Sequence, residues 1–478
     1  MRTHHNFYID GQWVAPAAGA VAFDVINPAT EEVAGSVLLG GPADVERAIG
    51  AAHRAFASFS QTTLQSRIEL LSRITSIYQR RMDDMAAAIS AEMGAPLHSL
   101  AKPVQAPIGL WHLQTTLALA KDFPFEQTQG TTLLVKEPVG VCALITPWNW
   151  PMNQIVCKVA PALLTGCTVV LKPSELAPFS AQIFAEILHE AGVPAGVFNM
   201  IHGDGAKIGP LLSSHPLVDM VSLTGSTRAG TSVAQHAAET VKVVSLELGG
   251  KSANIILADA DLHAAVTHGV LSMMSNTGQS CNAPSRMFVP AARIDEVEQI
   301  AAAALATLVV GDPQSPTTTT GPIANERQFQ RVQALIAQGI SEGAKLIGGG
   351  CGRPDGINRG YFVKPTVFSR ATNQMTIARE EIFGPVLTII PYQSEAEAIA
   401  MANDTVYGLS GYVYGASVES ACKVAKRLRT GMVHLNGANL DLTAPFGGYK
   451  QSGSGREWGA AGIEEFLETK AVMGCQPA

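Results

Sequence analysis

The chain has 478 residues, of which 47% are hydrophobic and 15% are charged, and its formal net charge is −7. This length predicts about three domains, and the apolar content is ample for large cores. No block of lysine or arginine occurs that could follow a phosphate backbone or an anionic lipid surface, so neither nucleic acid nor membrane is expected as a partner.

The N-terminus lacks the apolar core segment of a signal peptide, and apolar stretches elsewhere are interrupted by Pro, Gly or Lys. The seven cysteines are scattered and include no Cys-x-x-Cys pair, which favours neither a disulfide framework nor a zinc site. We therefore predict a cytoplasmic protein without a metal site.

The N-terminal region is predicted to be a helical layer, because apolar residues recur at helical spacing over residues 45–56 and 68–82. Residues 121–136 and 468–473 are predicted to form short strands that have no core of their own. A surface hairpin is the simplest structure for such pieces.

From residue 139 onward, apolar runs alternate with helical stretches, which predicts βαβ units and a parallel sheet. The predicted strands are 141–145, 168–171, 197–201, 218–223 and 243–248, with helices such as 181–190 between them. A second α/β series follows Ser252, with predicted helices at 262–276, 294–308 and 326–342 and strands at 363–368 and 386–392.

The fourth of these strands leads into a glycine turn at residues 224–230, and a helix is predicted from Thr231. Strand, glycine turn and helix form a dinucleotide site in parallel sheets, although Thr227 stands where the usual fingerprint has a second glycine. Lys172 and Glu175 end an earlier strand, where ligands of such sheets bind. Taken singly, these features read as an ordinary loop and a solvated strand end.

Cys281 and Glu247 are the candidate catalytic pair. A lone cysteine is more often a small buried apolar residue than a nucleophile. A thiolate is, however, a strong nucleophile, and a carboxylate that activates water is what release of a covalent thiol intermediate requires. The two residues therefore make sense as one mechanism.

The segments around Glu247 and Cys281, in this order and separation, resemble the glutamate and cysteine signatures of the NAD(P)-dependent aldehyde dehydrogenase superfamily. The resemblance runs nearly end to end and includes further motifs at residues 147–151, 171–175, 224–227, 380–385 and 445–450. It implies an α/β fold of three parts. These are a Rossmann-type cofactor domain (1–115 and 139–248), an α/β catalytic domain (249–448) and a small β oligomerisation element (116–138 and 449–478).

The resemblance implies that Cys281 attacks an aldehyde, that a hydride passes to NAD, and that water activated at Glu247 hydrolyses the thioester to a carboxylic acid. Asn149 and the backbone N–H of Cys281 are expected to stabilise the oxyanion. The glutamate favours hydrolysis over transfer to coenzyme A. A cysteine hydrolase would need a histidine base, and none of the 12 histidines stands in a recognisable pairing motif. A catalytically silent binding or structural protein is the third alternative.

By resemblance, Lys172 and Glu175 contact the adenosine ribose, Glu381 holds the nicotinamide ribose and Phe383 lies against the nicotinamide ring. Trp148, Gly225 and Ser226 complete the expected cofactor site. NAD is expected to be preferred over NADP because Glu175 would repel a 2′-phosphate. The family resemblance also implies a homodimer or a homotetramer.

The expected substrate tunnel carries no charged residue; its positions are Trp150, Asn153, Gln154, Cys157, Ser275, Ser280, Asn282, Leu440 and Phe446. An acid semialdehyde would need a lysine or arginine for its distal carboxylate. We therefore predict a neutral, largely apolar aldehyde that is aromatic, medium-chain or terpenoid, such as geranial. A semialdehyde or betaine aldehyde, the latter bound through the π face of Trp150, remains the alternative.

Overall fold

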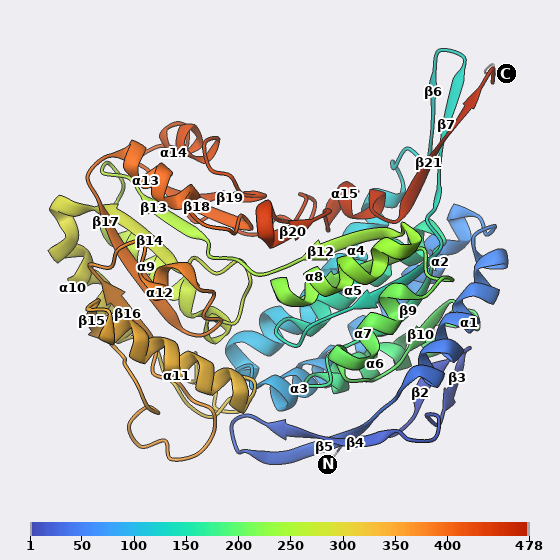
Figure 1. Ribbon diagram of the computed structural model, residues 1–478, viewed down its shortest axis with the longest axis horizontal. Helices are drawn as coiled ribbons and strands as arrows, with labels where there is room; N and C mark the ends of the chain where they lie inside the picture. The colour runs from blue at the N-terminus through green and yellow to red at the C-terminus, as the bar shows by residue number, and fades with distance from the viewer. Residues whose placement is uncertain (1, 476–478) are drawn as a thin grey trace.

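The computed structural model of the chain describes residues 2–475 and contains two large sheets, each covered by helices on both faces (Figure 1). The predicted α/β class is confirmed. Among the described residues, no helix combines the length and the apolar character needed to cross a bilayer.

The first sheet has the order β20-β12-β11-β8-β9-β10-β2-β3. Its five central strands run parallel: β8 (Val141–Ile145), β9 (Thr168–Lys172), β10 (Phe198–Met200), β11 (Met220–Thr224) and β12 (Val243–Glu247). The antiparallel edges are β2 (Phe7–Ile9), β3 (Gln12–Val14) and β20 (Gly453–Ser454).

Alternate residues of the central strands enter two different cores, because successive side chains of a strand point to opposite faces. Cys142 and Leu144 belong to one core and Val141 and Ala143 to the other. The first core is covered by α2 (Leu64–Arg80), α3 (Met82–Met93), α4 (Ala106–Ala120), α5 (Pro151–Thr165) and α6 (Pro178–Glu190). The second is covered by α1 (Pro42–Phe59), α7 (Gly205–Ser214) and α8 (Thr227–Ala237).

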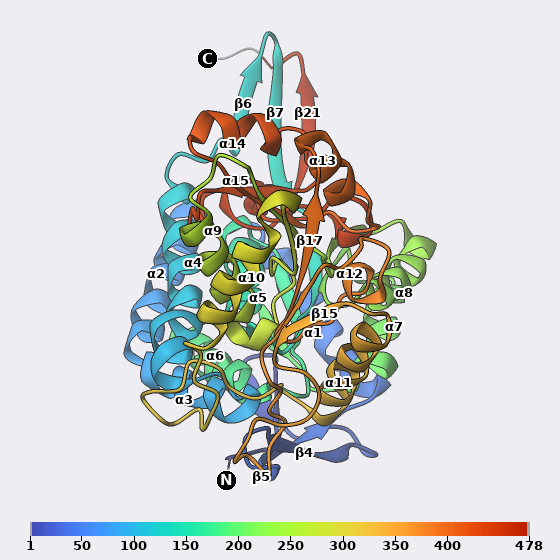
Figure 2. The same cartoon turned by 90° about the vertical axis from the view of Figure 1, so that its left-hand side faces the viewer.

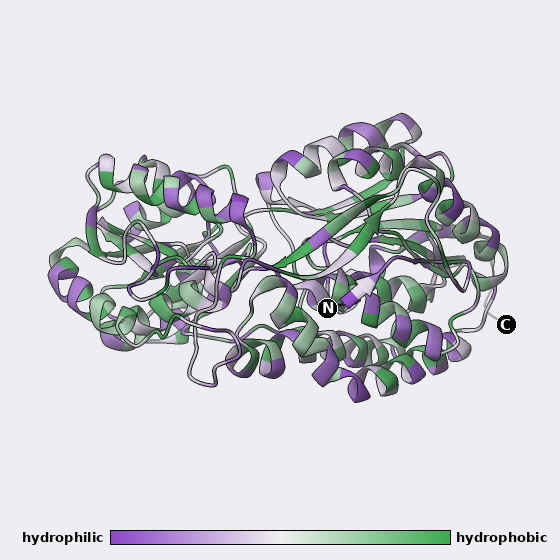
Figure 3. Cartoon of the chain, turned by 90° about the horizontal axis from the view of Figure 1, so that it is seen from below, coloured by the Kyte–Doolittle hydropathy of each residue, from purple (hydrophilic) through white to green (hydrophobic). Residues whose placement is uncertain are grey.

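The second sheet has the order β15-β16-β17-β14-β13-β18-β19. Its strands are β13 (Ala253–Ile256), β14 (Arg286–Pro290), β15 (Lys345–Gly348), β16 (Thr366–Ser369), β17 (Val386–Tyr392), β18 (Ser410–Tyr414) and β19 (Met432–Leu435). Its helices are α9 (Leu262–Met274), α10 (Ile294–Leu305), α11 (Glu326–Ser341), α12 (Thr376–Arg379), α13 (Glu395–Asn403) and α14 (Val418–Ala425). Figure 3 shows hydrophobic colour gathered on the strands and hydrophilic colour on the outer helices.

Two smaller sheets lie outside these layers. The strands β6 (Glu126–Gln129), β7 (Thr132–Pro138) and β21 (Leu467–Met473) form an antiparallel arm that projects from the molecule (Figures 1 and 2). The helix α15 (Gly459–Glu464) precedes β21. At the opposite end, β1 (Arg2–His4), β4 (Val21–Asn27) and β5 (Glu32–Leu39) form the other small sheet.

The structure differs from the predicted elements in several places. The N-terminal helical layer is preceded by five strands that the sequence did not predict. The helix predicted from Thr231 begins at Thr227, because the side chain of Ser226 accepts a hydrogen bond from the N–H of Ala229 and caps it. Residues 363–365 lie outside β16, and β20 joins the first sheet, although its residues fall in the predicted oligomerisation element.

Candidate active site

The candidate residues follow the carboxyl ends of the central strands of the first sheet, where ligands of parallel sheets bind. Asn149 follows β8, Lys172 ends β9, Gly225 follows β11 and Glu247 ends β12. The N–H of Gly225 donates to the backbone oxygen of Glu247 at 2.9 Å, so the glycine turn and the predicted base are held together.

Lys172 and Glu175 form an ion pair of 2.7 Å at the end of β9. The ammonium is buried, whereas the carboxylate is partly exposed and open to a ligand. The N-terminus of α8, capped by Ser226, follows β11, which β8 separates from β9 in the same sheet. A lysine, a carboxylate and a helix N-terminus together suit the ribose and phosphates of a dinucleotide.

Glu247 is only 2% exposed, and neither of its carboxylate oxygens has a hydrogen-bond partner among the described residues. Burial raises the pKa of Glu247 well above its ordinary value, and the nearby carboxylate of Glu457 raises the pKa further. A buried carboxyl group with free oxygens can exchange a proton with a water molecule or a thiol.

Beside Glu247 lies a buried ion pair between Lys158 of α5 and Glu457. The Sγ of Cys157 donates to the second oxygen of Glu457 at 3.3 Å. Because Glu457 and Lys158 already neutralise each other, neither is free to pair with a charged substrate.

Cys281 follows a loop with an unusual backbone. Asn276, Thr277 and Gly278 have φ values of 50°, 55° and 69°, in the left-handed region. A Cβ at Gly278 would lie 2.1 Å from the backbone oxygen of Gly384, so only glycine fits there. Such strain is held in place by surrounding contacts and is frequent at functional sites.

Asn149 is tied to this loop from both sides. Its Nδ2 donates to the backbone oxygen of Gln279 at 2.9 Å, and its backbone oxygen accepts from Nδ2 of Asn276 at 3.0 Å. Its Oδ1 accepts from Nε2 of Gln154 at 3.1 Å. The structure therefore places Asn149 next to the segment that leads to Cys281.

The thiol of Cys281 packs against an apolar cluster of Cys157, Leu409, Phe446 and Trp458. Burial raises the pKa of Cys281, and the carboxylates of Glu381 and Glu247 raise it further, while the backbone N–H of Asn282 lowers it. The resting group is thus a thiol, and a base must remove its proton before it can attack.

The remaining predicted cofactor residues also lie together. The N–H of Gly250 donates to Glu381 at 3.0 Å, and burial raises the pKa of Glu381 to about 7. The rings of Trp148 and Phe383 meet edge to face, with centroids 5.5 Å apart. Gly249 has no room for a Cβ, which would lie 2.2 Å from the Glu381 carboxylate.

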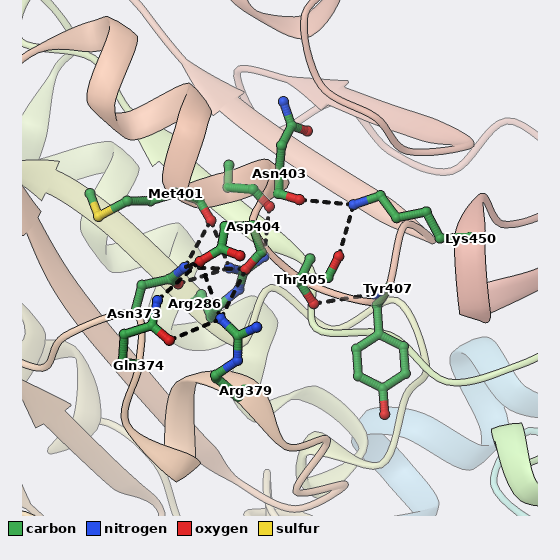
Figure 4. A network of polar contacts seen from close by, with 11 residues as sticks. Arg286, Asn373, Gln374, Arg379, Met401, Asn403, Asp404, Thr405, Tyr407 and Lys450 are labelled. Carbon is green, nitrogen blue, oxygen red and sulfur yellow. Dashed lines mark hydrogen bonds and ion pairs between the residues drawn. The ribbon is translucent and has the colours of Figure 1, made fainter.

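A polar network around Arg286 joins β14 to Asn373 and to the end of α13 (Figure 4). The buried guanidinium of Arg286 donates to the backbone oxygens of Lys251, Met401 and Ala402 and to Oδ1 of Asn373. Lys450 donates to the backbone oxygens of Asn403, which ends α13, and of Thr405, which follows it. The loop that carries Gly249 and Gly250 is therefore anchored to the second sheet.

The predicted tunnel residues separate into three groups. Trp150 donates from Nε1 to Oγ of Ser280 at 2.8 Å, and Phe446 and Cys157 lie in the cluster around Cys281. Asn153 accepts a bond of 2.6 Å from the ring of His112, and Gln154 is buried against Asn149. Leu440 is 44% exposed; Ser275 begins the short 3₁₀ turn after α9, and the backbone oxygen of Asn282 accepts from Tyr412.

The sequence reasoning missed four residues of the site: His112, Lys158, Glu457 and Trp458. Trp458 packs its ring 4.5 Å from that of Phe446 and 5.2 Å from that of His112. His112, Cys157 and Trp458 line one narrow cavity. The run Arg456-Glu457-Trp458 offered a signal, because a charged pair beside a tryptophan is unusual next to the apolar and glycine residues that follow.

Comparison with known proteins agrees with this geometry. The Aldehyde dehydrogenase family model matches residues 13–472. A 3-succinoylsemialdehyde-pyridine dehydrogenase of a Pseudomonas species is 60% identical over 99% of both chains. A mutant aldehyde dehydrogenase C of Pseudomonas syringae, complexed with NAD+ and octanal, is 53% identical over 99% of this chain and 98% of its own, with a TM-score of 0.98.

A point mutant of betaine aldehyde dehydrogenase from Staphylococcus aureus, in complex with NAD+, is 36% identical, covers 100% of this chain and 99% of its own, and has a TM-score of 0.95. The family match spans nearly the whole chain, and the solved neighbours hold NAD+. The chain therefore belongs to the aldehyde dehydrogenase family and is an NAD-dependent aldehyde dehydrogenase.

Proposed function

We propose that Cys281 is the nucleophile, Glu247 the general base and Asn149 the oxyanion donor of this enzyme. The observation that carries the proposal is a buried carboxyl group, that of Glu247, near the partly buried Cys281. Glu247 has two free carboxylate oxygens, and its charge acts on the thiol of Cys281.

The steps follow from these positions. The thiol of Cys281 releases its proton to water, and its sulfur adds to the aldehyde carbon, while an N–H of Asn149 holds the resulting oxyanion. NAD, when bound against Lys172, Glu175, Glu381 and Phe383, supplies the acceptor for the hydride. Glu247 then activates a water molecule that hydrolyses the thioester and releases a carboxylic acid.

We propose a neutral aldehyde with an aromatic or medium-length tail as the substrate. The aromatic pair Phe446 and Trp458 beside Cys281 supports this class, and the nearby charges of Lys158 and Glu457 already pair with each other. The relative named for a pyridine semialdehyde and the neighbour that holds octanal fit the same class. Geranial remains one member of it.

His112 and Asn153 favour a substrate whose tail carries a hydrogen-bond acceptor. Because the ring of His112 occupies Oδ1 of Asn153, the Nδ2 of Asn153 is left as a donor for a keto or ring-nitrogen acceptor in the tail. This arrangement suits the pyridine and keto groups of the semialdehyde for which the relative is named.

A panel of aldehydes tests the substrate. We expect kcat/KM with NAD to be highest for benzaldehyde, octanal, geranial and 3-pyridyl keto-aldehydes, and lowest for succinate semialdehyde and betaine aldehyde. A lead for either charged compound overturns the neutral class. An Asn153→Leu variant separates the two features: it should weaken only the keto-aldehyde, with octanal as the matched control.

We further propose that the antiparallel arm of β6, β7 and β21 joins copies of the chain into a homodimer or homotetramer. Val472 and Met473 on β21 are exposed apolar residues, Met473 at 77%, at an edge that another chain could cover. Analytical ultracentrifugation of a Met473→Asp variant tests the arm, since a weaker assembly is expected.

We also propose the cytoplasm as the compartment, because all seven cysteines are free.

A further inference from the structure

We propose that Gln154 is a positioning residue of the reaction: its side-chain amide fixes the orientation of the Asn149 amide, so that Asn149 presents an N–H to the reacting carbonyl oxygen. This inference rests on the proposed function, which gives Asn149 the oxyanion contact. Gln154 was expected to line the substrate tunnel, whereas the structure buries it against Asn149.

The orientation of Asn149 can be read from its partners. The backbone oxygen of Gln279 only accepts hydrogen bonds, so the atom 2.9 Å from it must be the nitrogen of the Asn149 amide. The oxygen of that amide then faces the other way, and Nε2 of Gln154 donates to it at 3.1 Å. One N–H of Asn149 is used by Gln279, and the second is left for the substrate oxygen.

The glutamine side chain at position 154 buries an unpaired oxygen atom, which packing alone would not require. The side chain is 4% exposed, and its own Oε1 has no hydrogen-bond partner among the described residues. An apolar side chain of the same length would fill the space on α5 without burying an unpaired oxygen. The amide therefore has one interaction that a methionine would lose, which is the bond to Asn149.

Removal of this donor leaves Oδ1 of Asn149 without a partner. The amide can then turn about its Cβ–Cγ bond, and the free N–H no longer points at a fixed position. Because the oxyanion forms only after attack, the loss acts on the transition state rather than on binding of NAD or aldehyde.

The test compares Gln154→Met, Gln154→Glu and Asn149→Ala, with Gln182→Met as the matched control. Gln182 is another buried glutamine with an unpaired Oε1, and it lies on α6. We expect Gln154→Met to slow the NADH burst roughly tenfold, less than the 10²–10³ that loss of a direct oxyanion donor costs. The dissociation constant of NAD and the melting temperature should stay near those of the native chain.

Gln154→Glu supplies a pH signature that a structural role would not produce. A protonated carboxyl group can donate to Oδ1 of Asn149, whereas an ionised one repels it. The burst rate of this variant, divided by that of the native chain, should therefore fall as the pH rises. A ratio that does not change with pH, or a native burst rate in Gln154→Met, overturns the inference.

Asn149→Ala shows which proposal has failed. If Asn149→Ala loses the burst while Gln154→Met keeps it, the oxyanion role stands and the positioning role is wrong. If Asn149→Ala also keeps the burst, the oxyanion contact itself is wrong, and the inference on Gln154 falls with it.

Discussion

Lys158 and Glu457 form a buried ion pair beside Glu247, although 299 residues separate them in the chain. The negative charge of Glu457 raises the pKa of Glu247, and the positive charge of Lys158 lowers it. Neither residue forms a hydrogen bond with Glu247, whose oxygens have no partner among the described residues. The pair therefore adjusts the pKa of the proposed base without touching it, in addition to the larger effect of burial.

The first prediction concerns two variants, each of which removes one charge of this ion pair. Glu457→Gln should lower the pKa of Glu247, and Lys158→Met should raise it, because each change removes one of two opposed charges. The acidic limb of the steady-state pH profile should move to lower pH in the first variant and to higher pH in the second. Both variants leave an unpaired buried group, so thermal melting should accompany the assay. Shifts in the same direction would contradict the prediction.

The second prediction concerns the nucleophile. Cys281→Ser should bind NAD normally and lose dehydrogenase activity, because an alcohol without a strong base is a far weaker nucleophile than a thiolate. Cys422→Ser, on α14, is the matched control and should retain native kcat. In the native chain the burst rate should rise with pH, since burial raises the pKa of the Cys281 thiol. More than a small residual kcat in Cys281→Ser would exclude the assignment.

The third prediction separates the two steps at Glu247. Glu247→Gln should leave the first hydride transfer more intact than turnover, because the base is needed mainly to hydrolyse the thioester. Stopped-flow absorbance should show a burst of NADH followed by slow turnover. If burst and turnover fall together, the carboxylate also serves to deprotonate Cys281.

The fourth prediction gives Glu247 a stability signature. Its pKa is raised in the folded chain, so the stability that its proton contributes is fully present below the unfolded pKa and is lost as the pH rises through the folded pKa. Glu247→Gln removes this loss. The melting temperature of the variant should match the native value in acid and exceed it increasingly toward alkaline pH. A difference that is constant with pH would count against the buried, unpaired carboxylate.

The fifth prediction concerns the cofactor. Glu175→Gln should shift the ratio of kcat/KM for NAD over NADP toward NADP by roughly tenfold, about 1.4 kcal/mol, which is within the repulsion expected between two charges near a surface. Lys172, 2.7 Å from Glu175, would then be free to pair with the 2′-phosphate. Glu190→Gln, at the end of α6, is the control. An unchanged ratio would show that Glu175 does not select the cofactor.

Much of the first sheet could be predicted from the sequence, because its strands are short apolar runs between helices. The prediction for β8 matched both ends of the strand, and that for β17 in the second sheet did the same. The N-terminal strands β2 and β3 could not be found this way. They have three residues each; β3 pairs with β2, and β2 joins the sheet only through β10, which lies far along the chain.

The residues of the candidate site likewise divide into those that local motifs reveal and those that depend on distant partners. Cys281, Glu247 and Asn149 stand in local motifs, so the sequence pointed to them. Lys158 and Glu457 do not, because a buried ion pair is a relation between two distant segments and leaves no local pattern. For the same reason, Gln154 was assigned to the tunnel: its position on α5 is readable from the chain, but its partner is not.

The antiparallel pairing of β20 with β12 also decides the order in which the active site can be completed during synthesis. Glu247 ends β12, but β20 must emerge from the ribosome before that edge of the sheet is paired. Glu457 comes later still. The second sheet, formed from residues between these points, can gather on the nascent chain first. The β12 edge of the first sheet is thus completed only after every residue proposed for catalysis has been synthesised.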